Sequence, residues 1–200
     1  DMRPVTIIGH SLGGSISLLY TSVYPDNVKK LVAIEGLGSS PSMQEKLMEK
    51  SIGDRIRDWM GDLRQSSGRS ARRYPTLEDA FQRMQNENPH LSEAQARHLT
   101  IHGSNQNEDG TFSWKFDNYV RFFAFSGLPS NDLKKLWADI KCPTLLVRGV
   151  ESWASDPVAD GRTERFNCPI EVEVFEKAGH WVHHDQLEGF VERVRTFLAD

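Results

Sequence analysis

The pentapeptide Gly9-His10-Ser11-Leu12-Gly13 has the spacing G-x-S-x-G and is the first feature of the sequence that could do chemistry. A β-branched run precedes it and an apolar stripe at helical spacing follows it, so Ser11 falls on a strand-to-helix turn. Such a turn holds a serine in strained geometry with its hydroxyl exposed. We predict that Ser11 is a nucleophile and that the backbone N–H of Leu12 stabilises an oxyanion. The alternative is a small-residue turn that only packs the helix on the strand.

A serine nucleophile needs a base, and His180 in the segment Ala178-Gly179-His180-Trp181 is the best candidate. It follows the last predicted strand, residues 170–175. Because parallel strands end at the same edge of a sheet, the loop after one strand can reach the turn after another. Other nearby histidines are predicted to lie on a surface or helix start (His183 and His184) or beside the turn (His10).

The third group of such a site is an acid that orients the imidazole from the ring nitrogen facing away from Ser11. In the chain order serine, acid, histidine, three carboxylates follow predicted strands. They are Glu35, Glu151 and Asp156. Residue types and order leave these three alternatives open.

The elements that must position these residues form an α/β pattern. Apolar runs predict four strands and two amphipathic helices: strands at residues 4–9, 31–34, 142–147 and 170–175, and helices at residues 12–23 and 187–198. The first strand, helix and second strand make a βαβ unit, which predicts parallel strands joined by a right-handed crossover.

Residues 39–140 differ in character, because they are charged and show helical periods with no convincing strand. We predict an α/β core over residues 1–38 and 141–200, with residues 39–140 inserted as a helical cap. Two helix N-caps are predicted inside the insertion, at Thr76 with Asp79 and at Ser92 with Gln95.

Aromatic side chains cluster between residues 112 and 125. They could line an apolar pocket for an acyl or alcohol group, although packing within the cap itself is the competing interpretation. The predicted pocket residues are Trp114, Phe122 and Phe123, together with Trp181 beside the proposed base.

Three segments in this order resemble the α/β-hydrolase superfamily: GHSLGG at residues 9–14, PTLLVRG at residues 143–149 and AGHW at residues 178–181. The resemblance extends over nearly the whole chain, and residues 39–140 correspond to the cap domain of that family. Within the family, the chain also resembles the serine-hydrolase-like subgroup through Asn88-Pro89-His90-Leu91-Ser92-Glu93, Asp109-Gly110 and Phe116-Asp117.

The resemblance also bears on the acid. Many family members have an aspartate three residues beyond the glycine that corresponds to Gly149, and this chain has Ser152 there. Some relatives, haloalkane dehalogenases among them, take a glutamate from the end of the preceding strand, where Glu35 lies. The resemblance therefore favours Glu35, then Glu151, then Asp156. Ser11 stands where dehalogenases have an aspartate, which argues against dehalogenation.

Family members have about four strands before the strand that leads to the nucleophile, and an early loop supplies a second oxyanion donor. This chain begins at that strand. The resemblance therefore implies the C-terminal part of a longer hydrolase and a partial sheet. An uncovered sheet edge could pair with another chain, so self-association is expected of such a part.

Composition excludes several other classes of protein. The 24 Lys and Arg residues against 28 Asp and Glu give a net charge of −4, unlike the basic surface of a nucleic-acid binder. No apolar run approaches the roughly 20 residues that span a bilayer. Cys142 and Cys168 lack metal-ligand spacing, and we expect reduced thiols in a cytoplasmic protein with no metal or organic cofactor.

Together these features predict a serine hydrolase that cleaves an ester, thioester, lactone or similar small apolar substrate through an acyl-enzyme. Ser11 attacks, His180 transfers the proton and Glu35 orients the imidazole. One alternative is a non-catalytic protein that keeps the pocket only for binding, suggested by Ser152 in place of the usual acid. Another is a fragment that is inactive by itself.

Overall fold

The computed structural model describes residues 4–67, 71–117 and 130–199. Residues 1–49 and 126–200 form one compact unit, and residues 50–125 form a second. The first unit includes α2 (Pro41–Glu49) and α6 (Ser130–Ala138), which the sequence prediction assigned to the insertion. The domain boundaries at residues 38 and 141 stay a prediction.

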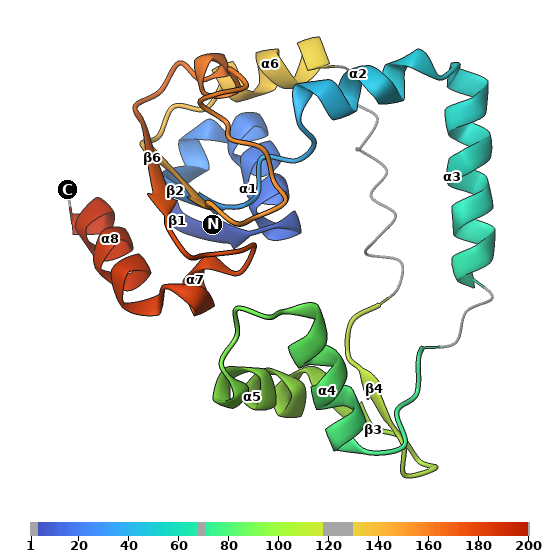
Figure 1. The fold of residues 1–200 in the computed structure, drawn as a ribbon. Helices are drawn as coiled ribbons and strands as arrows, with labels where there is room; N and C mark the ends of the chain where they lie inside the picture. The colour runs from blue at the N-terminus through green and yellow to red at the C-terminus, as the bar shows by residue number, and fades with distance from the viewer. Residues whose placement is uncertain (1–3, 68–70, 118–129, 200) are drawn as a thin grey trace. The chain divides into compact units, whose positions relative to one another are not determined.

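The first unit is built on a parallel sheet in the order β1-β2-β5-β6 (Figure 1). Its strands are β1 (Val5–His10), β2 (Val28–Ile34), β5 (Thr144–Gly149) and β6 (Ile170–Phe175). All four predicted strands are confirmed, and α1 (Leu12–Val23) joins β1 to its parallel neighbour β2 as the βαβ pattern predicts. Short 3-10 turns lie at Pro25–Asn27 and Thr163–Arg165.

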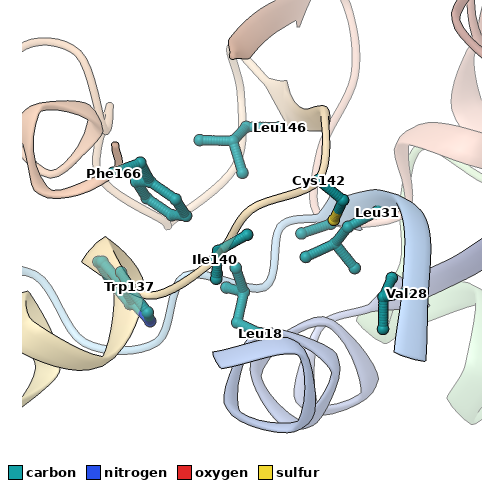
Figure 2. Packing of buried hydrophobic residues seen from close by; sticks show 9 residues of the cluster. Leu18, Val28, Leu31, Trp137, Ile140, Cys142, Leu146 and Phe166 are labelled. Atoms are coloured by element: carbon teal, nitrogen blue, oxygen red, sulfur yellow. The ribbon is translucent and has the colours of Figure 1, made fainter. Parts of the chain in front are cut away.

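Helices cover both faces of this sheet. Successive side chains of the central strands point to opposite faces, and each face forms an apolar cluster with the helices that cover it. Leu31 of β2 packs with Leu18 of α1, with Trp137 of α6 and with Ile140 just after that helix (Figure 2). Ala33 of β2 belongs to the same cluster. The other face belongs to α7 (Val182–Asp185) and α8 (Leu187–Ala199), with these core residues: Val32, Ile34, Leu145, Val147, Ala178, Val182, Val194 and Phe197. Burial on two faces explains why the strands are nearly continuous apolar runs in the sequence.

The second unit contains α3 (Ile52–Ser67), α4 (Leu77–Glu87) and α5 (Glu93–Gly103). Phe81, Leu91 and Ala96 form the centre of its packing. Both predicted N-caps are confirmed, since each forms a capping box in which side chain and backbone bond reciprocally.

The prediction of no strand in this region is wrong. Ser104–Gln106 (β3) and Phe112–Trp114 (β4) form an antiparallel pair. The connecting turn contains Gly110 at a φ of 83°, which a glycine adopts without strain. Strands of three residues are too short to show alternation in a sequence, so the pattern gave no sign of them.

None of the helices in the described part of the chain is long and apolar enough to cross a bilayer.

Candidate active site

Ser11 occupies the turn between β1 and α1 in a backbone conformation that a side-chain-bearing residue rarely adopts. Its φ is 54° and its ψ is −118°. The Ser11 N–H donates to the carbonyl of Ile34 at 2.8 Å, which fixes the turn against the end of β2. Gly9 permits the tight turn, because a Cβ there would lie 2.6 Å from the Gly13 carbonyl oxygen. The sequence folds this way because glycine lets strand and helix approach where a larger residue would clash.

The His180 imidazole reaches Ser11 from the loop after β6. His180 Nε2 lies 2.9 Å from Ser11 Oγ, within hydrogen-bonding distance. Two bonds hold the loop: the His10 Nε2–H donates to the His180 carbonyl at 2.8 Å, and the Gly179 N–H donates to Asp185 Oδ2 at 2.8 Å.

Gly149, at the end of β5, leaves room for that loop. A Cβ on residue 149 would lie 2.2 Å from the Ala178 carbonyl oxygen and 2.4 Å from that of Gly179. Any larger residue at this position would push the histidine loop away from Ser11.

Glu35 faces the other ring nitrogen of the imidazole. Its Oε2 lies 3.4 Å from His180 Nδ1, and the Glu35 side chain has no exposed surface. The Gly149 N–H donates to Oε1 at 2.8 Å and the Ser152 hydroxyl donates to Oε2 at 2.6 Å. Because burial of a polar group without a partner is costly, these two donors stabilise the Glu35 carboxyl group inside the protein.

The other two acid candidates are placed differently. Glu151 is exposed, and its backbone N–H donates to the Ala178 carbonyl at 2.9 Å. The Asp156 Oδ2 accepts a hydrogen bond from the Arg148 guanidinium at 3.1 Å, and its Oδ1 accepts one from the Val158 N–H. The structure thus brings Ser11, His180 and Glu35 together, in the arrangement that nucleophilic catalysis by serine requires.

A pocket of about 450 Å³ opens beside Ser11, within the first unit. Leu12, whose backbone N–H lies in the first turn of α1, lines it next to the serine. Such N–H groups have no acceptor inside the helix, so they can donate to an anion. The apolar part of the wall includes Leu12, Leu37, Met43, Trp153 and Pro157.

The four aromatic residues predicted to line a pocket are placed elsewhere or lie outside the described residues. Trp114 packs edge-on against Tyr74 in the second unit and donates its Nε1–H to the tyrosine hydroxyl at 3.2 Å. Trp181 packs against the rings of His10 and His184. Neither tryptophan lines the 450 Å³ pocket as the described residues define it. Phe122 and Phe123 lie outside the described residues, and a binding role for all four stays a prediction.

Sequence reasoning missed three side chains at this site. Ser152 donates to Glu35, and Trp153 lies against the His180 ring. Arg162, which is 2% exposed, binds Asp160 Oδ1 and the carbonyls of Ser155 and Gly38. Arg162 therefore ties the loop after β5 to the loop after β2. The sequence indicated only that both loops follow strands ending at the same edge of the sheet, and not which side chains would meet there.

Two histidines near the site, His10 and His183, have lowered pKa values. Burial lowers the pKa of His10, although its bond to the His180 carbonyl acts in the opposite direction. Burial, together with the nearby His10, His184 and His180 rings, lowers the pKa of His183 to about 4. The His10 and His183 rings therefore add little positive charge near Ser11 at neutral pH.

Comparison with known proteins finds similar sequences over most of this chain. A family model described as alpha/beta hydrolase fold matches residues 1–187. The esterase Rv0045c of Mycobacterium tuberculosis is 26% identical, and a serine hydrolase-like protein of Danio rerio is 30% identical, each over 96% of this chain and 60% of the relative. The chain thus spans about three fifths of the length of these curated relatives.

Solved structures show the same fold. The thioesterase domain from the curacin biosynthetic pathway superposes with a TM-score of 0.75 at 22% identity. The match covers 97% of this chain and 67% of the thioesterase chain.

Proposed function

The chain belongs to the α/β-hydrolase fold family, and on this premise we propose that it is a serine hydrolase acting through an acyl-enzyme. The observation that carries the proposal is the approach of Ser11 Oγ to His180 Nε2 at 2.9 Å, with Glu35 at the opposite ring nitrogen. Curated relatives of the chain carry the names of esterases and hydrolases, which supports a hydrolase.

The proposed reaction has two halves. Ser11 Oγ attacks the substrate carbonyl carbon while His180 Nε2 takes the hydroxyl proton, and the carbonyl oxygen becomes an oxyanion facing the Leu12 N–H. The tetrahedral intermediate then collapses, and His180 returns the proton to the leaving alcohol or thiol. Water attacks the acyl-enzyme by the same route and releases the acid and free Ser11. These steps use protein groups and water alone.

The pocket supports a small substrate with an apolar part. Leu37, Met43 and Trp153 offer apolar surface close to the nucleophile, and a volume of about 450 Å³ is in the range of small-molecule sites. We propose an ester, thioester, lactone or related acyl compound as the substrate. The cytoplasm is the proposed location, supported by two free cysteines that are buried or half-buried.

A fluorophosphonate probe tests this proposal, because it phosphonylates only an activated serine. We expect labelling of Ser11, identified by peptide mass spectrometry, and no labelling of Ser11→Ala. Ser22→Ala is the matched control, since it removes a buried serine hydroxyl of α1 that bonds the Leu18 carbonyl. An unlabelled Ser11 in folded protein, beside a labelled reference hydrolase, would refute the proposal in favour of a non-catalytic binding protein.

A further inference from the structure

The Ser152 hydroxyl contacts the carboxylate oxygen that faces the proposed base. Ser152 Oγ lies 2.6 Å from Glu35 Oε2, and the same oxygen lies 3.4 Å from His180 Nδ1. The serine is in the turn after β5, whereas Glu35 directly follows β2. The hydroxyl and the carboxylate therefore come from the ends of two different strands.

The Ser152 hydroxyl has a second partner besides Glu35. The Ala154 N–H donates to Ser152 Oγ at 3.2 Å, while the hydroxyl itself donates to Glu35 Oε2. A hydroxyl has one donor proton and two acceptor lone pairs, so Ser152 takes part in both bonds at once. The two bonds hold the hydroxyl between the backbone of its own turn and the carboxylate.

Together with the Gly149 N–H, this hydroxyl fixes the orientation of the carboxylate. The Gly149 N–H holds Oε1 at 2.8 Å and Ser152 holds Oε2, so both oxygens are bonded to the segment that ends and follows β5. With only the Gly149 bond, the carboxylate could rotate about its Cγ–Cδ bond. The backbone of Glu35 has a φ of 50°, a left-handed conformation that residues with a side chain rarely adopt.

We propose that Ser152 is a positioning residue, whose hydroxyl directs Oε2 of Glu35 towards Nδ1 of His180. Its effect on rate rests on the proposed function, but its effect on the imidazole does not. The role differs from a purely structural one because Ser152 acts through the hydrogen bond between Glu35 and the Nδ1 atom of His180.

Ser152→Ala tests the effect on rate. We expect kcat per titrated active site to fall about tenfold with KM within about twofold, because a hydrogen bond to the Glu35 carboxyl group is lost away from the substrate. Ser152→Thr, which keeps a hydroxyl on Cβ, should restore most of kcat. Ser22→Ala, a matched loss of a buried serine hydrogen bond, should keep wild-type kinetics. If Ser152→Ala does not fold, Ser152→Cys keeps the size with a weaker donor and should show an intermediate loss.

The NMR signal of the His180 Nδ1 proton gives a readout that needs no turnover. Its assignment comes from its absence in His180→Gln. We expect Ser152→Ala to shift or remove this signal and Ser152→Thr to retain it. A change of the signal in a protein that neither turns over nor labels would support the positioning role and refute the proposed function. An unchanged signal, with or without a loss of kcat, would overturn the positioning role.

Discussion

The indole ring of Trp153 lies against the imidazole of His180, with ring centroids 4.9 Å apart and planes tilted by 34°. Trp153 is nevertheless 77% exposed and lines the pocket beside Ser11. A large exposed aromatic ring at this place offers apolar contact area to a substrate.

We expect Trp153→Ala to raise KM for apolar esters by about five- to tenfold, since contact equivalent to about one to two CH₂ groups is lost. The increase should grow with acyl chain length in a series of p-nitrophenyl esters. Trp59→Ala, which removes an exposed tryptophan of α3, serves as the control. Equal KM changes along the whole ester series would contradict a binding role for Trp153.

The stability of the protein should depend on pH through His183. Burial lowers its pKa from 6.5 to about 4, so the unfolded chain binds the proton first as pH falls. The free energy of unfolding should therefore decrease between about pH 6.5 and pH 4. Urea titrations across this range should show a smaller slope against pH for His183→Gln than for wild type. Part of the slope should remain, because the pKa of His10 is also lowered by burial. The exposed His98→Gln should keep the full slope.

The sheet and its connections could be predicted from sequence because buried strands and helices show as apolar runs and apolar stripes. Residues 170–175 were predicted as a strand and form β6 with the same bounds, and α1 follows the predicted stripe. Both predictions use the spacing of apolar residues within one short segment of the chain. The strand-to-helix context of Ser11 belongs to this class, since the motif and both elements lie within about twenty residues.

The environment of Glu35 could not be predicted in the same way. Its donors, Gly149 and Ser152, are 114 and 117 residues away along the chain. A serine in a turn has no sequence signal that distinguishes a carboxylate donor from a solvated side chain. From sequence, Ser152 was notable only because an aspartate is usual there. Its contact with Glu35 depends on the order β2-β5 in the sheet, which brings the two turns together.

The C-terminal helix α8 should depend on Lys30 for stability. Lys30 is 9% exposed, and its Nζ donates to the carbonyls of Phe197 at 2.7 Å and Leu198 at 3.2 Å. These carbonyls lie in the last turn of the helix, where intrahelical donors are absent. We expect Lys30→Met to lower the free energy of unfolding by about 1–3 kcal/mol in urea titrations. Lys29→Met, an exposed neighbour in β2, should have little effect. Equal losses in both variants would show that the contact with α8 is unimportant.

The identity of the acid can be tested by three matched substitutions, Glu35→Gln, Glu151→Gln and Asp156→Asn. Glu35 is the candidate whose carboxylate lies 3.4 Å from His180 Nδ1, so its amide variant should reduce kcat by about 10²- to 10⁴-fold with a small change in KM. The amide keeps the shape of the side chain but removes the charge that stabilises imidazolium. Glu151 is exposed and Asp156 binds Arg148, so their variants should stay within about threefold of wild type. A larger loss for Glu151→Gln than for Glu35→Gln would keep the hydrolase and overturn this assignment of the acid.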